Sequence, residues 1–312
     1  VRHNVPMIYY HVWDNFPYPQ YNKAFYDSND FVATISKVTD EIVSNVSPDV
    51  DRQYVPHAVN LEIFKPHDED FVKSMRQDNF KENKDKFIVF WNNRNARRKM
   101  GATLINWFNK FLDKVGHDKA ILLMHTNPAD QAGPNLEALI KDLDMDNGKV
   151  LFSREKLHPE NLALMYNMVD CTINISDAEG FGLGTLESLS CGTPIIVNMT
   201  GGLQEQVTDG KEWFGIGLEP TSKTIVGSQQ VPYIYEDRLS EHQVVDALVE
   251  MYNKSTKERK ELGLKGRNHV EKNYNFDNFI KTWDEIFTQV HEKHGSWKSR
   301  NRKQNWTLEE VA

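Results

Sequence analysis

The sequence predicts an α/β protein with two doubly wound lobes of parallel sheet, of which the first is incomplete. Short apolar runs rich in β-branched and aromatic residues alternate with longer helical patterns, which is typical of parallel βαβ units. The 312 residues suffice for two domains. The pattern breaks near 60–67, before a charged helical stretch. We therefore expect a partial lobe over 1–64 and a complete lobe over 65–274.

The first lobe shows only part of a doubly wound sheet. We expect strands at 7–11, 31–35 and near 53–55, with helices at 21–26 and after Ser36. The second lobe shows a complete set, with strands at 87–91, 120–125, 150–152, 171–176 and 194–198. Ligands of such sheets bind beyond the carboxyl ends of the strands.

Three further helices are expected at 240–254, 256–271 and 277–293. We expect the last of them, within 275–294, to pack back on the first lobe. The polar tail over 295–312 carries Lys298, Arg300, Arg302 and Lys303 and is interpreted as a solvated extension.

Composition limits the classes of function. Hydrophobic residues make up 39% and charged residues 26%, as in ordinary globular proteins. The net charge of -8 gives no support for a nucleic-acid partner. No apolar run has the roughly 18–20 residues that cross a bilayer, although a peripheral membrane contact stays open. With two isolated cysteines, Cys171 and Cys191, and no leader pattern, we expect a cytoplasmic protein.

The most informative segment, 176–187, directly follows a predicted strand. Its glycines Gly180, Gly182 and Gly184 let the backbone approach a ligand, and the helix that begins near Gly184 directs free N–H groups at it. An anion is the natural occupant of such a site. Glu179 and Glu187 flank this cradle, and their carboxylates can accept hydrogen bonds from sugar or ribose hydroxyls.

A second loop, 91–101, leaves the first strand of the complete lobe. It gathers Arg94, Arg97, Arg98 and Lys99. Arg offers a planar fork for phosphate oxygens and Lys a mobile charge, so together they suit a diphosphate.

The segment 176–187 resembles the Glu-x7-Glu signature of family 4 retaining glycosyltransferases, which have the two-lobed, Rossmann-like GT-B fold. The turn 191–194 and the pair Gly201 and Gly202 resemble later motifs of that family. The stretch 55–60 is similar to the family's entry into the second lobe, although Ala58 replaces the usual Gly and Asn60 the usual Asp. The resemblance covers nearly the whole chain, and it implies that the family's first strands and glycine-rich loop precede Val1.

The resemblance implies roles for these residues. Arg94 and Lys99 match the spacing of the family's diphosphate-binding pair, and His11 matches a strand-end histidine that faces the donor sugar. Asn93 stands where the family has Gly; because Asn tolerates a left-handed backbone, we expect the turn to be kept there. Glu187 would hold the ribose and Glu179 the transferred sugar. The expected donor-binding residues are Gly180, Phe181, Gly182, Leu183, Gly184, Thr185 and Glu187, with Ser153 and Arg154 at the base.

The expected reaction is retaining transfer of a sugar from a nucleoside diphosphate sugar to a hydroxyl of a glycan, lipid or other acceptor. By the resemblance, a donor phosphate oxygen helps to deprotonate that hydroxyl. No cofactor is expected. The Asp-x-Asp triplets within 68–70 and 142–146 lie at a helix start and a turn, so no metal is expected. Two alternatives stay open: a noncatalytic sugar-nucleotide-binding or scaffolding protein, and an epimerase or phosphorylase on the same fold.

Overall fold

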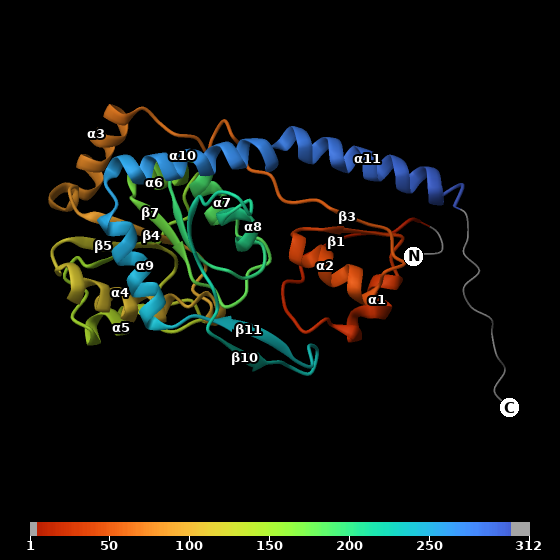
Figure 1. The fold of residues 1–312 in the computed structure, drawn as a ribbon, viewed down its shortest axis with the longest axis horizontal. Coiled ribbons are helices and arrows are strands. Elements are labelled where there is room, and N and C mark those ends of the chain that lie inside the picture. Colours follow the sequence, from red (N-terminus) through yellow and green to blue (C-terminus); the bar gives the residue numbers. More distant parts are fainter. Residues whose placement is uncertain (1–4, 301–312) are drawn as a thin grey trace.

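The computed structural model, which describes residues 5–300, confirms an α/β chain with two lobes of parallel sheet (Figure 1). The first lobe holds a three-stranded sheet in the order β1-β2-β3. Its elements are β1 (Ile8–His11), η1 (Gln20–Asn22), α1 (Lys23–Asp27), β2 (Phe31–Thr34), α2 (Lys37–Val46) and β3 (Arg52–Tyr54).

Strand β2 is buried along its whole length because both of its faces are covered. Val32 packs in a cluster with Ile42 of α2, whereas Phe31 and Ala33 pack with Ile286 of α11 (Phe276–His294). Alternate side chains of a strand point to opposite faces, so α2 and α11 lie on opposite sides of this sheet. The last helix thus packs on the first lobe (Figure 1).

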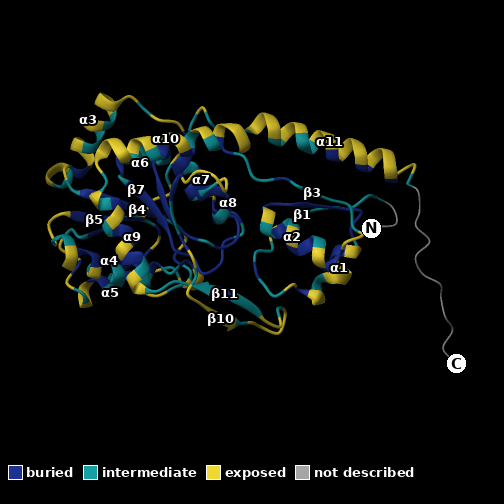
Figure 2. Ribbon diagram, viewed as in Figure 1, coloured by how far each residue is buried: buried dark blue, intermediate teal, exposed yellow. Residues whose placement is uncertain are grey.

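The second lobe holds a six-stranded parallel sheet in the order β6-β5-β4-β7-β8-β9. Its strands are β4 (Phe87–Asn92), β5 (Ala120–His125), β6 (Val150–Ser153), β7 (Cys171–Asn174), β8 (Ile195–Asn198) and β9 (Gly215–Leu218). The strands are nearly continuous apolar runs because helices cover both faces, and they form the buried centre of the lobe (Figure 2).

Alternate residues of β4 separate the two cores of this lobe. Val89 and Trp91 pack with residues of α4 and α9, while Ile88 and Phe90 pack with residues of α6 and α7. The helices are α3 (Glu69–Phe80), η2 (Lys81–Asn83), η3 (Arg97–Lys99), α4 (Gly101–Val115), α5 (Leu136–Asp142), α6 (Pro159–Met168), α7 (Leu183–Ser190), α8 (Leu203–Val207), α9 (Glu241–Asn253) and α10 (Thr256–Asn273).

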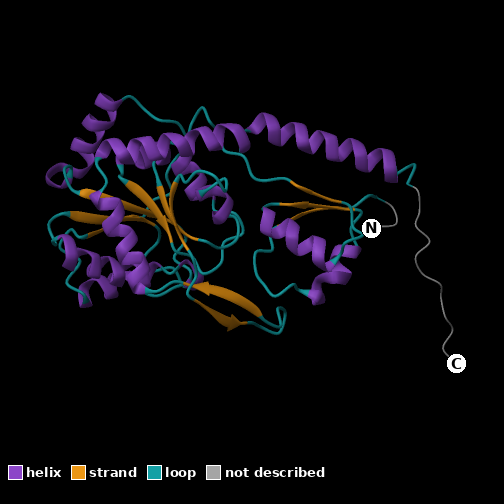
Figure 3. Ribbon diagram, in the orientation of Figure 1, coloured by secondary structure: helices purple, strands orange, loops and turns teal. Residues whose placement is uncertain are grey.

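Three strands were not expected from the sequence: β9 and the antiparallel hairpin of β10 (Ser222–Val226) and β11 (Ile234–Arg238) (Figure 3). β9 has four residues, two of them glycines, and β10 is largely exposed, so neither gives an apolar signal. The hairpin reaches the first lobe. The Tyr235 N–H donates to the Phe16 carbonyl over 2.7 Å, and the Asn15 amide donates to the Tyr235 carbonyl over 3.0 Å.

The chain crosses between the lobes near 55–64 and again near 274–276, and these crossings touch. The Val59 N–H donates to the Tyr274 carbonyl over 2.9 Å. Beside them, the buried carboxylate of Glu205 in α8 accepts hydrogen bonds from the Lys37 N–H at the start of α2, over 2.8 Å, and from the Tyr54 hydroxyl, over 2.5 Å. Burial raises the pKa of Glu205 above its ordinary value.

The interpretation of the tail as a solvated extension is wrong for Arg300. Its guanidinium donates to both carboxylate oxygens of Asp30, over 2.9 and 2.8 Å, and its side chain is 5% exposed. A buried carboxylate in the first lobe provides the partner. Arg302 and Lys303 lie outside the described residues.

Candidate active site

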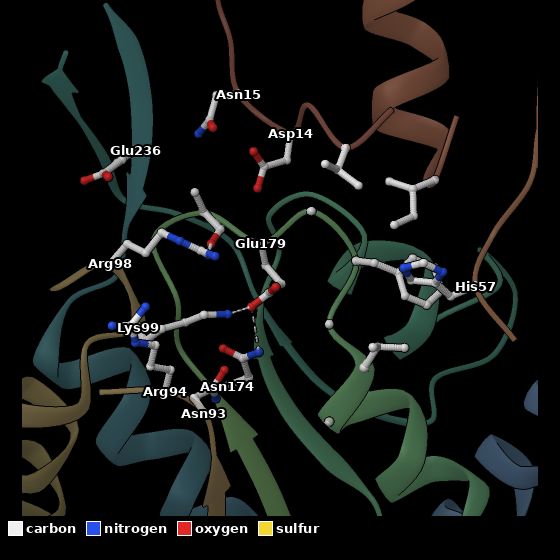
Figure 4. Close-up of a pocket in the computed structure, with 18 of the residues that line it drawn as sticks. Asp14, Asn15, His57, Asn93, Arg94, Arg98, Lys99, Asn174, Glu179 and Glu236 are labelled. Carbon is white, nitrogen blue, oxygen red and sulfur yellow. Dashed lines mark hydrogen bonds and ion pairs between the residues drawn. The ribbon is translucent and has the colours of Figure 1, made fainter. Parts of the chain in front are cut away.

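The candidate site is a cavity between the two lobes, where the strand order of the larger sheet reverses. The chain leaves β4 toward one face of this sheet and β7 toward the other, which opens a crevice at their carboxyl ends. The cavity has a volume of about 540 Å³ (Figure 4). It is lined by the segment after β1, by His57 between the lobes, by the loops after β4 and β7, and by β11.

The loop after β4 brings three of the four predicted cations to the cavity wall: Arg94, Arg98 and Lys99. The short η3 turn and Met100, with a left-handed φ of 58°, lead this loop into α4. The expectation of a left-handed turn at Asn93 is wrong. The loop reverses at Met100, directly before the helix, so Asn93 needs no unusual backbone conformation.

Lys99 is buried in the cavity floor, where its ammonium group contacts the Glu179 carboxylate. The Asn174 amide donates to the same Glu179 oxygen over 3.4 Å. Burial lowers the pKa of Lys99 from its ordinary value, and the Glu179 charge opposes that shift. The structure therefore joins the two predicted loops through opposite charges.

Arg94 has an exposed side chain on the same wall. Its guanidinium pairs with Asp130 in the loop after β5, with Nε–Oδ2 and Nη2–Oδ1 distances of 2.8 and 3.1 Å. The hydrogen bond from Arg94 lowers the pKa of Asp130 to about 2. Asp130 thus fixes the direction of a guanidinium that lines the cavity.

Arg97 and Arg98 serve mainly as connections between segments. Arg97 pairs through both Nη atoms with Glu236 of β11, over 2.8 and 2.6 Å. Arg98 donates to the Ala178 carbonyl, and its own carbonyl accepts from the Asp177 N–H over 2.9 Å. These contacts hold the hairpin and the glycine loop against the loop after β4.

The glycine loop after β7 ends at α7, which begins at Leu183. Gly182 has a φ of 94°, which L side chains rarely adopt. A Cβ on Gly201 would lie 1.9 Å from the Glu179 carbonyl, so the next loop can pack here only with glycine. Buried Thr185 donates to the Gly182 carbonyl over 2.8 Å and does not line the cavity. The lining residues are Gly180, Phe181, Gly182, Leu183 and Gly184.

Glu187 lies one turn into α7, just behind the cavity wall. Its carboxylate accepts a hydrogen bond from the buried Tyr166 hydroxyl over 2.8 Å, and that hydroxyl accepts from the Asn92 amide over 2.7 Å. Burial raises the pKa of Glu187 to about 7. Asn92 ends β4, so this chain of hydrogen bonds connects the start of the loop after β4 to the first turn of α7.

His11 does not line the cavity, in contrast to the expected role beside the donor sugar. Its side chain is buried, and Nε2 lies 2.8 Å from the Tyr26 hydroxyl in the first lobe. Burial lowers its pKa to about 4. The strand turns the imidazole toward α1, and it is His57 that lines the cavity, with Nδ1 3.1 Å from the Tyr10 hydroxyl.

Ser153 and Arg154 also lie outside the cavity lining. The Ser153 hydroxyl lies 2.9 Å from His125 Nδ1, and Arg154 pairs with Glu137 over 2.5 Å. Ser153 ends β6 and Arg154 follows it, and β6 lies two strands away from β4 in the sheet.

Several lining residues were missed from the sequence: Asp14, Asn15, His57, Ile234 and Glu236. His57 belongs to the stretch 55–60 that carries the family resemblance, and Asp14 follows His11 by three residues. The sequence could have indicated these two positions, because both lie in or close to motifs that were recognised there. Ile234 and Glu236 come from the unexpected hairpin and gave no such signal.

Within residues 5–300, no three His, Cys, Asp or Glu side chains are grouped so that they could hold a metal ion. Asp68, from one Asp-x-Asp triplet, caps α3 by accepting from the Asp70 and Phe71 N–H groups over 3.1 Å. Over the same residues, no helix is both long and apolar enough to cross a membrane.

The family model described as glycosyl transferases group 1 matches residues 71–226, half of the chain. The chain belongs to this family. It is 27% identical over 184 residues to D-inositol 3-phosphate glycosyltransferase of Paenarthrobacter aurescens, covering 58% of this chain and 43% of that protein. It is 25% identical over 214 residues to N-acetyl-alpha-D-glucosaminyl L-malate synthase of Bacillus anthracis, covering 68% and 52%. The chain thus spans about half the length of these curated relatives.

Solved structures confirm the GT-B fold of the chain. Sucrose-phosphate synthase of Thermosynechococcus elongatus superposes with a TM-score of 0.70 at 22% identity, covering 87% of this chain and 61% of that one. HepE of Anabaena, solved with UDP and glucose, gives a TM-score of 0.69 at 14% identity, covering 91% and 71%.

Proposed function

We propose that this chain transfers a sugar from a nucleoside diphosphate sugar to an acceptor hydroxyl, with retention at the anomeric carbon and without a metal ion. The observation that carries this proposal is the cavity at the strand-order reversal, where the cationic loop and the glycine loop meet through Lys99 and Glu179. Family membership supports sugar transfer.

The departing diphosphate is the main electrostatic problem, because charge develops on it as the bond to the sugar breaks. Arg94 and Lys99 supply positive charge on one wall, and the N–H groups at the start of α7 supply donors on the other. Both cations are held in place before the donor arrives, Arg94 by Asp130 and Lys99 by Glu179. Fixed donors of this kind stabilise charge without reorganising during the reaction.

Glu179 and Glu187 would contact the two other polar parts of the donor, the transferred sugar and the ribose. Glu179 lies in the lining of the cavity and would accept hydrogen bonds from the transferred sugar. Glu187 lies behind the phosphate cradle and would hold the ribose hydroxyls, with Tyr166 orienting its carboxylate. Because Ser153 and Arg154 are outside the lining, they could contact the base only if the donor extends beyond β5.

We propose that the two lobes bind different substrates. The acceptor side would consist of residues 1–64 together with the helix in 275–294, and the donor side of residues 65–274. The packing of α11 on β2 supports this grouping. The acceptor would be a glycan, a lipid or another hydroxyl compound that enters against the first-lobe part of the lining.

Calorimetry with a panel of uridine, guanosine and adenosine diphosphate sugars, with and without chelator, tests the donor and the metal. We expect binding of at least one donor that survives chelation; loss of all binding in chelator would contradict the metal-free reaction.

The bound donor is then offered an acceptor panel that includes D-inositol 3-phosphate and L-malate, the compounds in the names of two relatives. Proton NMR of the product reports the anomer, and an inverted anomer would contradict retention. An epimerised donor or a sugar phosphate would favour the epimerase or phosphorylase alternative, and binding without transfer the noncatalytic one.

A further inference from the structure

The cavity lining also contains Asp14, which belongs to the first lobe and to neither of the two loops of the second lobe. It lies three residues after the end of β1 and lines the cavity from the first lobe. Figure 4 shows its carboxyl group pointing across the cavity toward Arg98 and Glu179. It therefore faces the reacting part of the donor site from the side that the acceptor would occupy.

Asp14 differs from the other carboxylates of the lining. Glu179 is paired with Lys99, and Glu236 is paired with Arg97. In the part of the chain that the structure describes, 5–300, Asp14 forms no ion pair. Thus no ion pair in these residues explains why a carboxylate occupies this position.

The position of Asp14 is nevertheless fixed. The next two residues, Asn15 and Phe16, are both hydrogen-bonded to the backbone of Tyr235 in the hairpin. On the other side, a Cβ built on Gly201 would lie 3.2 Å from the Asp14 Cβ. The segment is thus held between the hairpin and the loop that supports Glu179.

The charges around Asp14 tune its proton affinity. Burial and the facing Glu179 carboxylate raise its pKa, and Arg98 and Lys99 lower it, with a net rise to about 6. At neutral pH the carboxylate is mostly ionised but close to its titration range. A proton acceptor works best when its pKa lies near the working pH.

We propose that Asp14 accepts the proton of the acceptor hydroxyl during sugar transfer, an inference that rests on the proposed function. The acceptor oxygen bonds to the anomeric carbon while the bond from that carbon to the diphosphate oxygen breaks. The electron pair of the broken bond leaves with the nucleoside diphosphate. The hydroxyl proton moves to a carboxylate oxygen of Asp14 and is later lost to solvent.

A donor phosphate oxygen is the competing proton acceptor. The two proton acceptors can be distinguished experimentally. If a phosphate oxygen is the base, replacement of Asp14 should hardly change the reaction rate. Asp14→Asn removes the proton acceptor at constant shape, Asp14→Glu restores a carboxylate, and Asp49→Asn, at an exposed position of the same lobe, is the matched control.

The test measures donor cleavage from pH 5 to 9, with water and with the hydroxyl acceptor panel, beside calorimetric binding of the donor. We expect wild-type kcat/KM to fall below a pH of about 6. Asp14→Asn should lose that acid limb and about 10²-fold or more in kcat, while donor affinity stays within about threefold, a factor worth under 1 kcal/mol. Asp14→Glu should recover part of the rate, and Asp49→Asn should match the wild type.

Asp14→Asn with a wild-type rate and an unchanged acid limb would overturn the role of Asp14 and leave the proposed function standing. Failure of the proposed function would appear separately, as absence of donor binding by the wild-type chain. A wild-type chain that binds the donor but cleaves it at no pH would overturn both.

Discussion

The ammonium group of Lys99 contacts the carboxylate of Glu179 in the buried floor of the cavity, which joins the loop after β4 to the loop after β7. Since the pair is buried, removal of either partner leaves the other charge without compensation. The contact therefore makes the cation and the sugar-facing carboxylate depend on each other.

Replacing the cations of the loop after β4 one at a time should separate phosphate contacts from structural ones. We expect Arg94→Ala and Lys99→Ala to weaken nucleoside diphosphate binding about tenfold or more, since a charged hydrogen bond is worth roughly 1.5–3 kcal/mol. Arg97→Ala should have a smaller effect, because Arg97 lies outside the cavity lining and both of its Nη atoms bind Glu236. Calorimetric titration measures each affinity.

Arg98→Ala serves as the comparison within the same loop, because Arg98 supports the backbone at Ala178. We expect a loss smaller than that for Arg94. Equal losses in all four variants would indicate diffuse attraction instead of defined contacts.

Glu187→Gln and Glu179→Gln should affect different parts of the donor. Glu187 would bind the ribose, so its replacement should weaken the nucleoside diphosphate and its sugar conjugates alike. Glu179 lines the cavity, and Gln keeps its shape and an oxygen that can face Lys99, so Glu179→Gln should reduce turnover and sugar selectivity while nucleoside diphosphate affinity stays nearly unchanged. If neither variant changed that affinity in a folded protein, the assignment of Glu187 to the ribose would be wrong.

Glu187 should also give stability an unusual dependence on pH. Burial raises its pKa from 4.5 to about 7, so between these values the folded chain holds a proton that the unfolded chain has lost. This group therefore stabilises the fold below pH 4.5, and its contribution falls as the pH rises toward 7, by roughly 1.4 kcal/mol per unit.

Urea unfolding of wild type and Glu187→Gln at pH 5 and pH 7.5 measures this contribution. The variant should gain stability relative to the wild type as the pH rises. Parallel pH dependences in the two proteins would contradict a raised pKa.

Glu205→Ala should loosen the contact between the lobes. The substitution leaves the Lys37 N–H and the Tyr54 hydroxyl without their acceptor, and an unsatisfied buried group costs about 1–3 kcal/mol. We expect a clear fall in the unfolding midpoint. Glu212→Ala is the control, because its exposed pair with Lys265 contributes at most about 1 kcal/mol. Equal midpoints for the two variants would refute the role of Glu205.

The parts of the site set by local sequence could be predicted. The glycine loop and the apolar strand before it are continuous in the chain, so Glu179, Gly182 and Glu187 could be placed relative to one another. Side-chain direction could not be predicted in the same way. The strand that ends at His11 was expected, but whether its imidazole faces the cavity or α1 depends on packing with Tyr26.

The partners of the cations could not be predicted because they are distant in the chain. Arg97 binds Glu236, 139 residues away, on a hairpin without an apolar pattern. Because the side chains of β10 are exposed, its sequence pattern is that of a loop. The segment forms a strand only through its pairing with β11.

The hydrogen bond between Val59 and Tyr274 has a mechanical consequence for the cavity. Because it ties the two chain crossings together close to the junction of α10 and α11, we expect the lobes to rotate about an axis near this junction. The hairpin lies on the opposite side of the molecule from this axis (Figure 1). A rotation that widens the cavity on that side must therefore break the hydrogen bonds between the hairpin and the first lobe, which are those of Tyr235 with Asn15 and Phe16 and that of the Tyr21 hydroxyl with the Tyr233 carbonyl.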